Sequence, residues 1–237
     1  MTPKKNNKSQ KPSRPQNIDI VFDVLEELWG NEKNEPRLGH EEPLDGLILT
    51  LLSQNTNDRN RDKGFAALKD SFPSWELVAS ASAEAIADRI RPAGLAKTKS
   101  ERMLQILASL KEKFGEYSLT TLKGKNNESV REYLSSLPGI GAKTVACVML
   151  FDLGMSAFPV DTHIARFCRR MKWAEESLPP DEIQPLLEEW VPETRFLGGH
   201  VNIIEHGRGL CHARNPACGK CPLRSKNLCP SAQEYTE

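Results

Sequence analysis

The sequence contains no apolar run that approaches the ~18 residues needed to cross a membrane. Its N-terminus also lacks the apolar core of a secretory signal peptide. These absences exclude an integral membrane protein and predict a cytoplasmic one. Of the 237 residues, 38% are hydrophobic and 27% are charged, which is typical of a globular protein that buries one good-sized core or two modest ones.

The sequence also has no net charge, because 32 basic residues balance 32 acidic ones. The charge is unevenly spread: residues 1–16 hold five basic residues and no acid, so the other 27 basic residues face 32 acidic ones, a net charge of −5. The five are Lys4, Lys5, Lys8, Lys11 and Arg14. We expect residues 1–16 to form a disordered basic tail, and any affinity for a polyanion to come from this tail and a local patch.

No stretch predicts a β-strand convincingly, and no internal repeat is visible. Apolar residues recur instead at helical spacing, and Gly, Pro and small polar residues separate the segments. The sequence therefore predicts an all-α fold. The expected helices lie at about 17–29, 44–52, 59–72, 75–79, 82–90, 95–114, 128–136, 142–153, 161–170, 180–191 and 194–210.

The most informative stretch is residues 137–146, LPGIGAKTVA, a short turn between two predicted helices. Pro138 fixes its own φ, whereas Gly139 and Gly141 permit positive φ and have no Cβ, so backbone N–H groups in the turn can approach an anion closely. The second helix directs the positive end of its dipole at the same point. Two glycines also occur in ordinary helix–helix turns, but this order of residues followed by Lys143 favours a turn that binds phosphate.

This stretch resembles the helix-hairpin-helix motif of the DNA glycosylase superfamily, and residues 160–164, VDTHI, resemble its second signature. Together they are similar to the endonuclease III family. The resemblance implies that Lys143 is the nucleophile and Asp161 its catalytic partner. Asp161 is also a good helix N-cap, which is the structural alternative for this residue.

The resemblance further implies a two-lobed helix-hairpin-helix glycosylase fold. A helical barrel lobe would span residues 45–155 and end in the hairpin. A cluster lobe would combine residues 17–44 with residues 156–237.

Four of the six cysteines, Cys211, Cys218, Cys221 and Cys229, lie within nineteen residues with the spacing C-x6-C-x2-C-x7-C. Structural zinc usually shows two short-spaced pairs, whereas here only Cys218 and Cys221 form such a pair, so the spacing modestly favours an iron–sulfur cluster. The resemblance implies a [4Fe–4S] cluster held by these four thiolates. The last spacing is five residues in the family and seven here, which changes the final loop but removes no ligand.

Several residues are candidates for contacts with DNA. The stretch between the cysteines is basic and has no acid, and within it Arg214 and Lys220 are the candidate phosphate contacts. The family fills the space left by a flipped-out base with a glutamine, which aligns with Asn55 and has Gln54 beside it. The family also pushes a leucine wedge into the duplex, which matches Leu95, and Lys99 would then meet phosphate.

The resemblance implies base-excision DNA repair by a bifunctional glycosylase. It would remove oxidised pyrimidines and then cleave the strand by β-elimination through a lysine Schiff base. Its partner would be double-stranded DNA with damaged bases or abasic sites, bound by a monomer in the nucleoid.

Three alternatives remain open: a mismatch-specific thymine or uracil glycosylase, an adenine glycosylase, and a non-catalytic DNA-binding iron–sulfur protein. Lys143 argues against strictly monofunctional glycosylases and, with Asp161, against a non-catalytic role. The absence of a long additional C-terminal domain argues against the adenine type.

Overall fold

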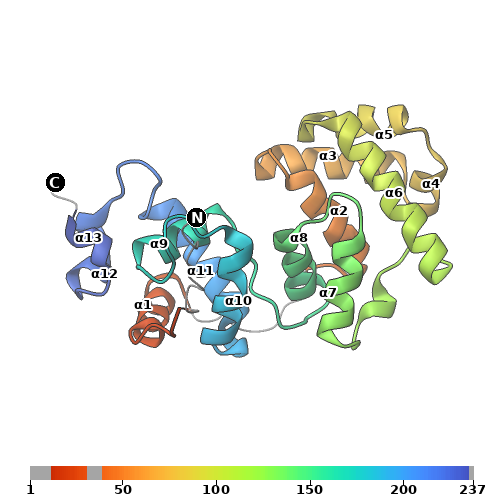
Figure 1. Cartoon of the computed structure of the whole chain (residues 1–237). Coiled ribbons are helices and arrows are strands. Elements are labelled where there is room, and N and C mark those ends of the chain that lie inside the picture. Colours follow the sequence, from red (N-terminus) through yellow and green to blue (C-terminus); the bar gives the residue numbers. More distant parts are fainter. Residues whose placement is uncertain (1–11, 31–38, 235–237) are drawn as a thin grey trace, which may run out of the picture. The chain divides into compact units, whose positions relative to one another are not determined.

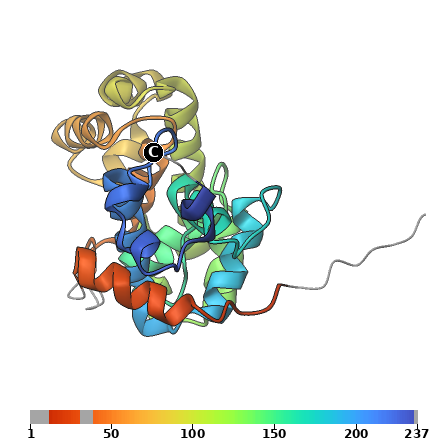
Figure 2. The same cartoon turned by 90° about the vertical axis from the view of Figure 1, so that its left-hand side faces the viewer.

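The structure is a computed structural model that describes residues 12–30 and 39–234. These residues form helices joined by turns, and no strand occurs among them, as both views show (Figures 1 and 2). The predicted all-α class is therefore confirmed. No helix in the described part of the chain is long and apolar enough to cross a membrane.

The α-helices are α1 (Ile18–Trp29), α2 (Pro43–Ser53), α3 (Asp58–Ser71), α4 (Trp75–Ser80), α5 (Ala83–Ile90), α6 (Ala96–Phe114), α7 (Asn127–Ser136), α8 (Ala142–Cys147), α9 (Thr162–Arg170), α10 (Pro180–Trp190), α11 (Phe196–Gly209), α12 (Pro222–Ser225) and α13 (Pro230–Glu234). Short 3-10 helices are η2 (Arg91–Ala93), η3 (Thr120–Leu122), η5 (Glu193–Arg195) and η6 (Cys218–Lys220), and η4 (Val148–Asp152) is a π-helix. Several helices begin where the side chain of a small polar N-cap accepts a backbone N–H, as at Asn57, Ser74, Ser82 and Asn126.

The chain divides into two compact units. We call residues 35–159 the hairpin unit, and residues 1–34 with 160–237 the cluster unit. The sequence predicts these divisions elsewhere, between residues 44 and 45 and between residues 155 and 156.

Glu42 accounts for the first of these differences. Its carboxylate accepts hydrogen bonds from Leu44 N at 3.0 Å, Leu119 N at 2.9 Å and Ser118 Oγ at 2.7 Å. All of these donors belong to the hairpin unit, so the entry to α2 packs there and not with the cluster unit.

The hairpin unit is built around α2, whose sequence is apolar on nearly every side and is therefore buried on nearly every side. The long helix α6 and the segment formed by α8 and η4 pack on the same core. Its central members are Leu47, Ile48, Leu51, Met103, Ile106, Leu107, Val145, Val148 and Met149.

In the cluster unit, α1 and α9 both pack against α11. The approach of α1 is close at Gly199, where a Cβ would overlap the Phe22 ring. The Asn202 amide also donates to Gly30 O at 3.0 Å, which secures the end of α1.

Part of the predicted disordered tail, residues 12–16, belongs to the described residues. Arg14 Nε donates to Trp190 O at 2.9 Å, and its Nη2 pairs with Asp19 at 2.6 Å. Residues 12–16 are thus attached to the cluster unit, which corrects the prediction for this part. Residues 1–11 lie outside the described residues.

Candidate functional site

The turn between α7 and α8 belongs to the hairpin unit, and its two glycines differ. Gly139 has φ of 75°, a left-handed conformation that favours glycine. Gly141 has φ of −93° and caps α8, so of the two glycines that permit a positive φ only Gly139 adopts one. No atom lies within 4 Å of the position that a Cβ would take at Gly141, so the backbone there is open to a ligand.

Lys143 lies in the first turn of α8, between the exposed Gly141 and the buried Thr144. Its side chain is half-buried, and no described residue forms a hydrogen bond or an ion pair with its amine. The helix then widens into the π-helix η4, a feature often found at functional sites. The Lys143 amine is thus carried by a largely buried helix and makes no hydrogen bond or ion pair that stabilises the described part of the chain.

Asp161 belongs to the cluster unit and is the N-cap of α9. Its Oδ1 accepts from His163 N at 2.8 Å and from Ile164 N at 2.9 Å. Among the described residues, Oδ2 has no hydrogen-bond partner. The structural role foreseen for this aspartate is present, and it uses only one of the two carboxylate oxygens.

The loop after α2 presents Gln54 and Asn55 differently. The Gln54 side chain is engaged within the hairpin unit, because Nε2 donates to Gly139 O at 3.2 Å and Oε1 accepts from Arg102 Nη1 at 3.5 Å. Asn55 is exposed and left-handed, with φ of 55°. Of the two candidates for filling the space of a flipped base, Asn55 is the one whose side chain is available.

Leu95 and Lys99 lie at the start of α6. Leu95 is 58% exposed, and its φ of 49° makes it an unusual left-handed leucine. Lys99 is buried, and its Nζ donates to Leu52 O, Gln54 O and Ala93 O at 2.7, 2.7 and 2.8 Å. The prediction that Lys99 meets phosphate is therefore wrong, because its ammonium faces the interior of the protein and has no hydrogen left to donate.

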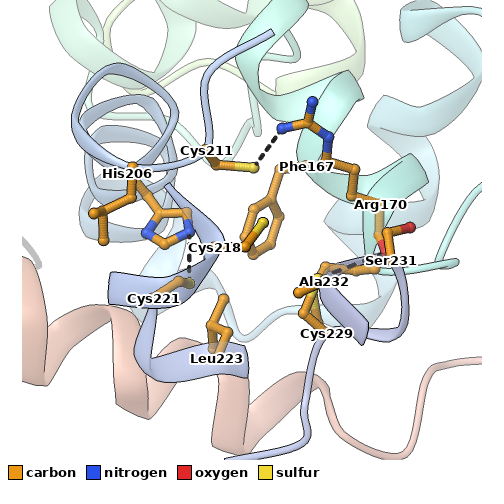
Figure 3. A pocket seen from close by; sticks show the side chains of 12 residues that line it. Phe167, Arg170, His206, Cys211, Cys218, Cys221, Leu223, Cys229, Ser231 and Ala232 are labelled. Carbon is orange, nitrogen blue, oxygen red and sulfur yellow. Dashed lines mark hydrogen bonds between the residues drawn. The ribbon is translucent and has the colours of Figure 1, made fainter. Parts of the chain in front are cut away.

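The four clustered cysteines line one cavity in the cluster unit (Figure 3). Apolar side chains form much of the rest of its wall, including Phe167, Met171, Leu210 and Leu223. Within the described part of the chain, no group of three or more His, Cys, Asp or Glu residues could hold a metal ion.

Two neighbouring side chains, Arg170 and His206, contact the thiols that line the cavity. Arg170 donates through Nη1 to Cys211 Sγ at 3.0 Å and to His212 O at 2.8 Å. His206 Nε2 lies 3.7 Å from Cys221 Sγ, and burial lowers the pKa of His206 to about 4, so its ring is neutral at pH 7. Arg170 and His206 reach the thiols through contacts between residues more than ten positions apart in the sequence. The type of a residue alone does not predict such a contact.

Arg214 and Lys220 are exposed, and neither pairs with a described residue. Both lie in the stretch that carries the first three clustered cysteines. They remain candidates for contacts with phosphate.

The comparisons with known proteins agree with this geometry. Residues 48–193 match the HhH-GPD superfamily of base excision DNA repair proteins. The chain belongs to this superfamily. Residues 211–225 match the iron–sulfur binding domain of endonuclease III.

Relatives and solved structures place the chain among the endonuclease III proteins. Endonuclease III of Thermotoga maritima is 35% identical over 201 residues, which cover 83% of this chain and 87% of that protein. A putative DNA glycosylase of Arabidopsis thaliana is 34% identical over 197 residues, or 82% of this chain and 67% of that protein. The structure of a non-covalent endonuclease III–DNA complex aligns with a TM-score of 0.78 at 25% identity, covering 92% of this chain and 96% of that one.

This HhH-GPD protein is accordingly a DNA glycosylase of base-excision repair, with the two-lobed endonuclease III fold and a [4Fe–4S] cluster. The cavity fits that cofactor, since a cubane cluster needs one thiolate per iron and an apolar surround. Burial raises the pKa of Cys218, Cys221 and Cys229, so iron must displace their protons when it binds.

Proposed function

We propose that this glycosylase is bifunctional: it removes oxidised pyrimidines from double-stranded DNA and then cleaves the strand at the abasic site. The observation that carries the proposal is the half-buried residue Lys143, whose amine pairs with no other described residue. A glycosylase that uses water as its nucleophile has no need of a lysine here, whereas a lyase requires an amine that can form an imine.

In the proposed reaction the neutral amine of Lys143 attacks C1′ of the damaged nucleotide. The bond between C1′ and the base breaks, and the base leaves with a proton. The second amine proton then passes to O4′ as the C1′–O4′ bond of the sugar ring breaks, which gives a Schiff base. Removal of a C2′ proton then expels the 3′-phosphate by β-elimination.

Asp161 is proposed as the catalytic partner of Lys143. Its Oδ2 would accept a proton from the attacking amine and stabilise the positive charge that develops on the sugar. Because the two residues belong to different units, this pairing rests on the resemblance to the family.

The DNA is proposed to bind as a kinked duplex with one nucleotide extruded, since a base inside the stack is out of reach. The backbone at Gly139 and Gly141 would bind a phosphate, Leu95 would enter the duplex, and Asn55 would occupy the space of the missing base. The exposure and left-handed backbone of Leu95 and Asn55 support these roles. We propose that one copy of the chain acts alone as a monomer.

The residues that would hold the [4Fe–4S] cluster are Cys211, Cys218, Cys221 and Cys229. When bound, the cluster cross-links the C-terminal loops of the cluster unit. We propose that the protein then presents Arg214 and Lys220 to DNA phosphates, which position the duplex without reading its sequence.

A borohydride trapping assay tests the function, with duplexes that carry an oxidised pyrimidine, a G·T or G·U mismatch, or an adenine opposite an oxidised guanine. Borohydride reduces an imine, so only a Schiff base gives a covalent complex. We expect trapping and strand cleavage with the oxidised pyrimidine. Preferential action on a mismatch would reassign the substrate, and base removal without trapping would reject the lyase mechanism.

Lys143→Gln should abolish both trapping and strand cleavage while DNA binding persists, because the lysine is proposed as a nucleophile and not as an anchor. Gel-shift assays with abasic-site DNA measure the binding that remains. A variant that still cross-links would show that another amine is the nucleophile.

A further inference from the structure

The buried Lys99 joins three segments of the hairpin unit. It projects from α6 with 1% of its surface exposed, and its Nζ contacts Leu52 O, Gln54 O and Ala93 O at 2.7 to 2.8 Å. An ammonium group has three hydrogens, so these bonds use all of them. Burial lowers the pKa of Lys99, yet only the charged form can satisfy all three carbonyl groups.

Two of these carbonyls stand next to strained loop tips. Gln54 O directly precedes Asn55, and Ala93 O lies two residues before Leu95. Both tips are left-handed: Leu95 has φ of 49°, which is costly for leucine, and Asn55 has φ of 55°, which asparagine adopts more readily. Such conformations persist only where the surrounding structure holds them, and here one cation binds the chain just before both tips.

The same helix reaches the hairpin turn through Gln54. Arg102, three residues after Lys99 and on the same face of α6, donates to Gln54 Oε1 at 3.5 Å. Gln54 Nε2 in turn donates to Gly139 O at 3.2 Å. The two loop tips and the hairpin are thus connected by hydrogen bonds within the hairpin unit.

We propose that Lys99 is a positioning residue that fixes the Asn55 and Leu95 loops, before DNA binds, in the geometry that keeps a nucleotide out of the duplex. The inference rests on the proposed function, which assigns both loops to base extrusion. Lys99 itself contacts no DNA. Because Lys99 keeps the two loops ordered in the free protein, the conformational entropy of ordering them is not lost when the base is unstacked.

The decisive comparison uses Lys99→Met, which keeps an unbranched side chain one atom shorter than lysine and removes its charge and donors. Two substrates are used: a duplex with an oxidised pyrimidine, and a single strand with an abasic site, which needs no base extrusion. The single-turnover rate on the duplex should fall about 10²-fold, the cost of misplacing reacting groups by about 1 Å. Borohydride trapping on the single strand should proceed as in the unaltered protein.

The matched control is Lys113→Met, the same substitution at an exposed site near the other end of α6. It should change neither rate. Equal losses on both substrates with Lys99→Met would indicate a general structural defect and overturn the proposal, as would an unchanged rate on the duplex. If the unaltered protein gives no trapped complex with either substrate, the proposed function fails, and the next measurement still tests whether the two loops are ordered before DNA binds.

Hydrogen exchange of the unaltered protein covers the case in which Lys99→Met does not fold. The Thr56 and Gly94 amides donate to Ser53 O and Arg91 O at 3.4 and 3.1 Å, inside the two loops. If Lys99 fixes the loops in advance, these amides are already protected in the free protein, and an abasic-site duplex adds little. Rapid exchange that slows only when DNA binds would mean that DNA orders the loops, and the proposal would be rejected.

Discussion

At the scale of single residues, the two oxygens of Asp161 allow its structural and catalytic roles to be separated. Oδ1 caps α9 through two backbone N–H groups, and Oδ2 has no partner among the described residues. Asparagine caps helices about as well as aspartate and carries no charge. Asp161→Asn therefore keeps the cap and removes the proposed base.

We expect Asp161→Asn to melt at nearly the temperature of the unaltered protein and to slow base removal by about 10²- to 10⁴-fold, as is typical when a general acid or base is lost. β-Elimination on a preformed abasic site should suffer less, because the base has already left. Asp161→Ala should also lose about 1 kcal/mol of stability with the cap. Single-turnover rates on both substrates and thermal melts provide the measurements, and equal damage to both reactions would make Asp161 mainly a cap.

At the scale of the elements, the hairpin turn uses its two glycines for different purposes. Two features disfavour a side chain at Gly139. Its φ of 75° is left-handed, and a new Cβ would lie 2.6 Å from Arg102 Cδ. A side chain at Gly141 meets no protein atom within 4 Å. The first glycine therefore shapes the turn, and we infer that the second keeps its outer surface clear for phosphate.

Gly139→Ala should lower stability by about 1–2 kcal/mol, the cost of a left-handed residue with a Cβ. Gly141→Ala should lower stability by only about 0.5 kcal/mol, because alanine is a poorer N-cap than glycine, and should weaken binding to duplex DNA, because its methyl group projects where the phosphate would approach. Chemical denaturation and fluorescence anisotropy distinguish the two variants. Tight DNA binding by Gly141→Ala would place the phosphate elsewhere.

The helices from α1 to α11 could be predicted from the sequence because their signals are local, whereas the short α12 and α13 were not predicted. N-caps such as Ser74 and Asn126 stand three residues or fewer from the N–H groups that they bind. The cysteine spacing and the hairpin residues are also local, and they led to the correct superfamily. The burial of Lys99 could not be predicted, since its acceptor Leu52 O is 47 residues away and is a backbone atom that carries no residue-specific signal. The same limit applies to Gly141, whose φ depends on the geometry of the whole turn.

At the scale of the whole molecule, a chain without net charge must bind a polyanion through a local concentration of positive charge. Two candidates remain: the exposed pair Arg214 and Lys220 in the cysteine loop, and residues 1–11 with Lys4, Lys5, Lys8 and Lys11. Arg14 is no longer a candidate, because it is bonded to Trp190 and Asp19. Deleting residues 1–11 therefore tests the tail without disturbing this attachment.

Replacing Arg214 and Lys220 with alanine should weaken binding to every duplex, because a side chain that binds phosphate positions DNA without reading its sequence. The slope of log affinity against log salt should become shallower by about 0.9 for each phosphate that is no longer neutralised.

Deleting residues 1–11 should weaken non-specific binding and leave turnover of a damaged duplex at low salt unchanged. The control is a double alanine variant of Lys63 and Lys113, which are exposed lysines on α3 and α6. If the deletion abolishes turnover while the Arg214 and Lys220 variant binds as tightly as the unaltered protein, the tail and not the cysteine loop holds the DNA.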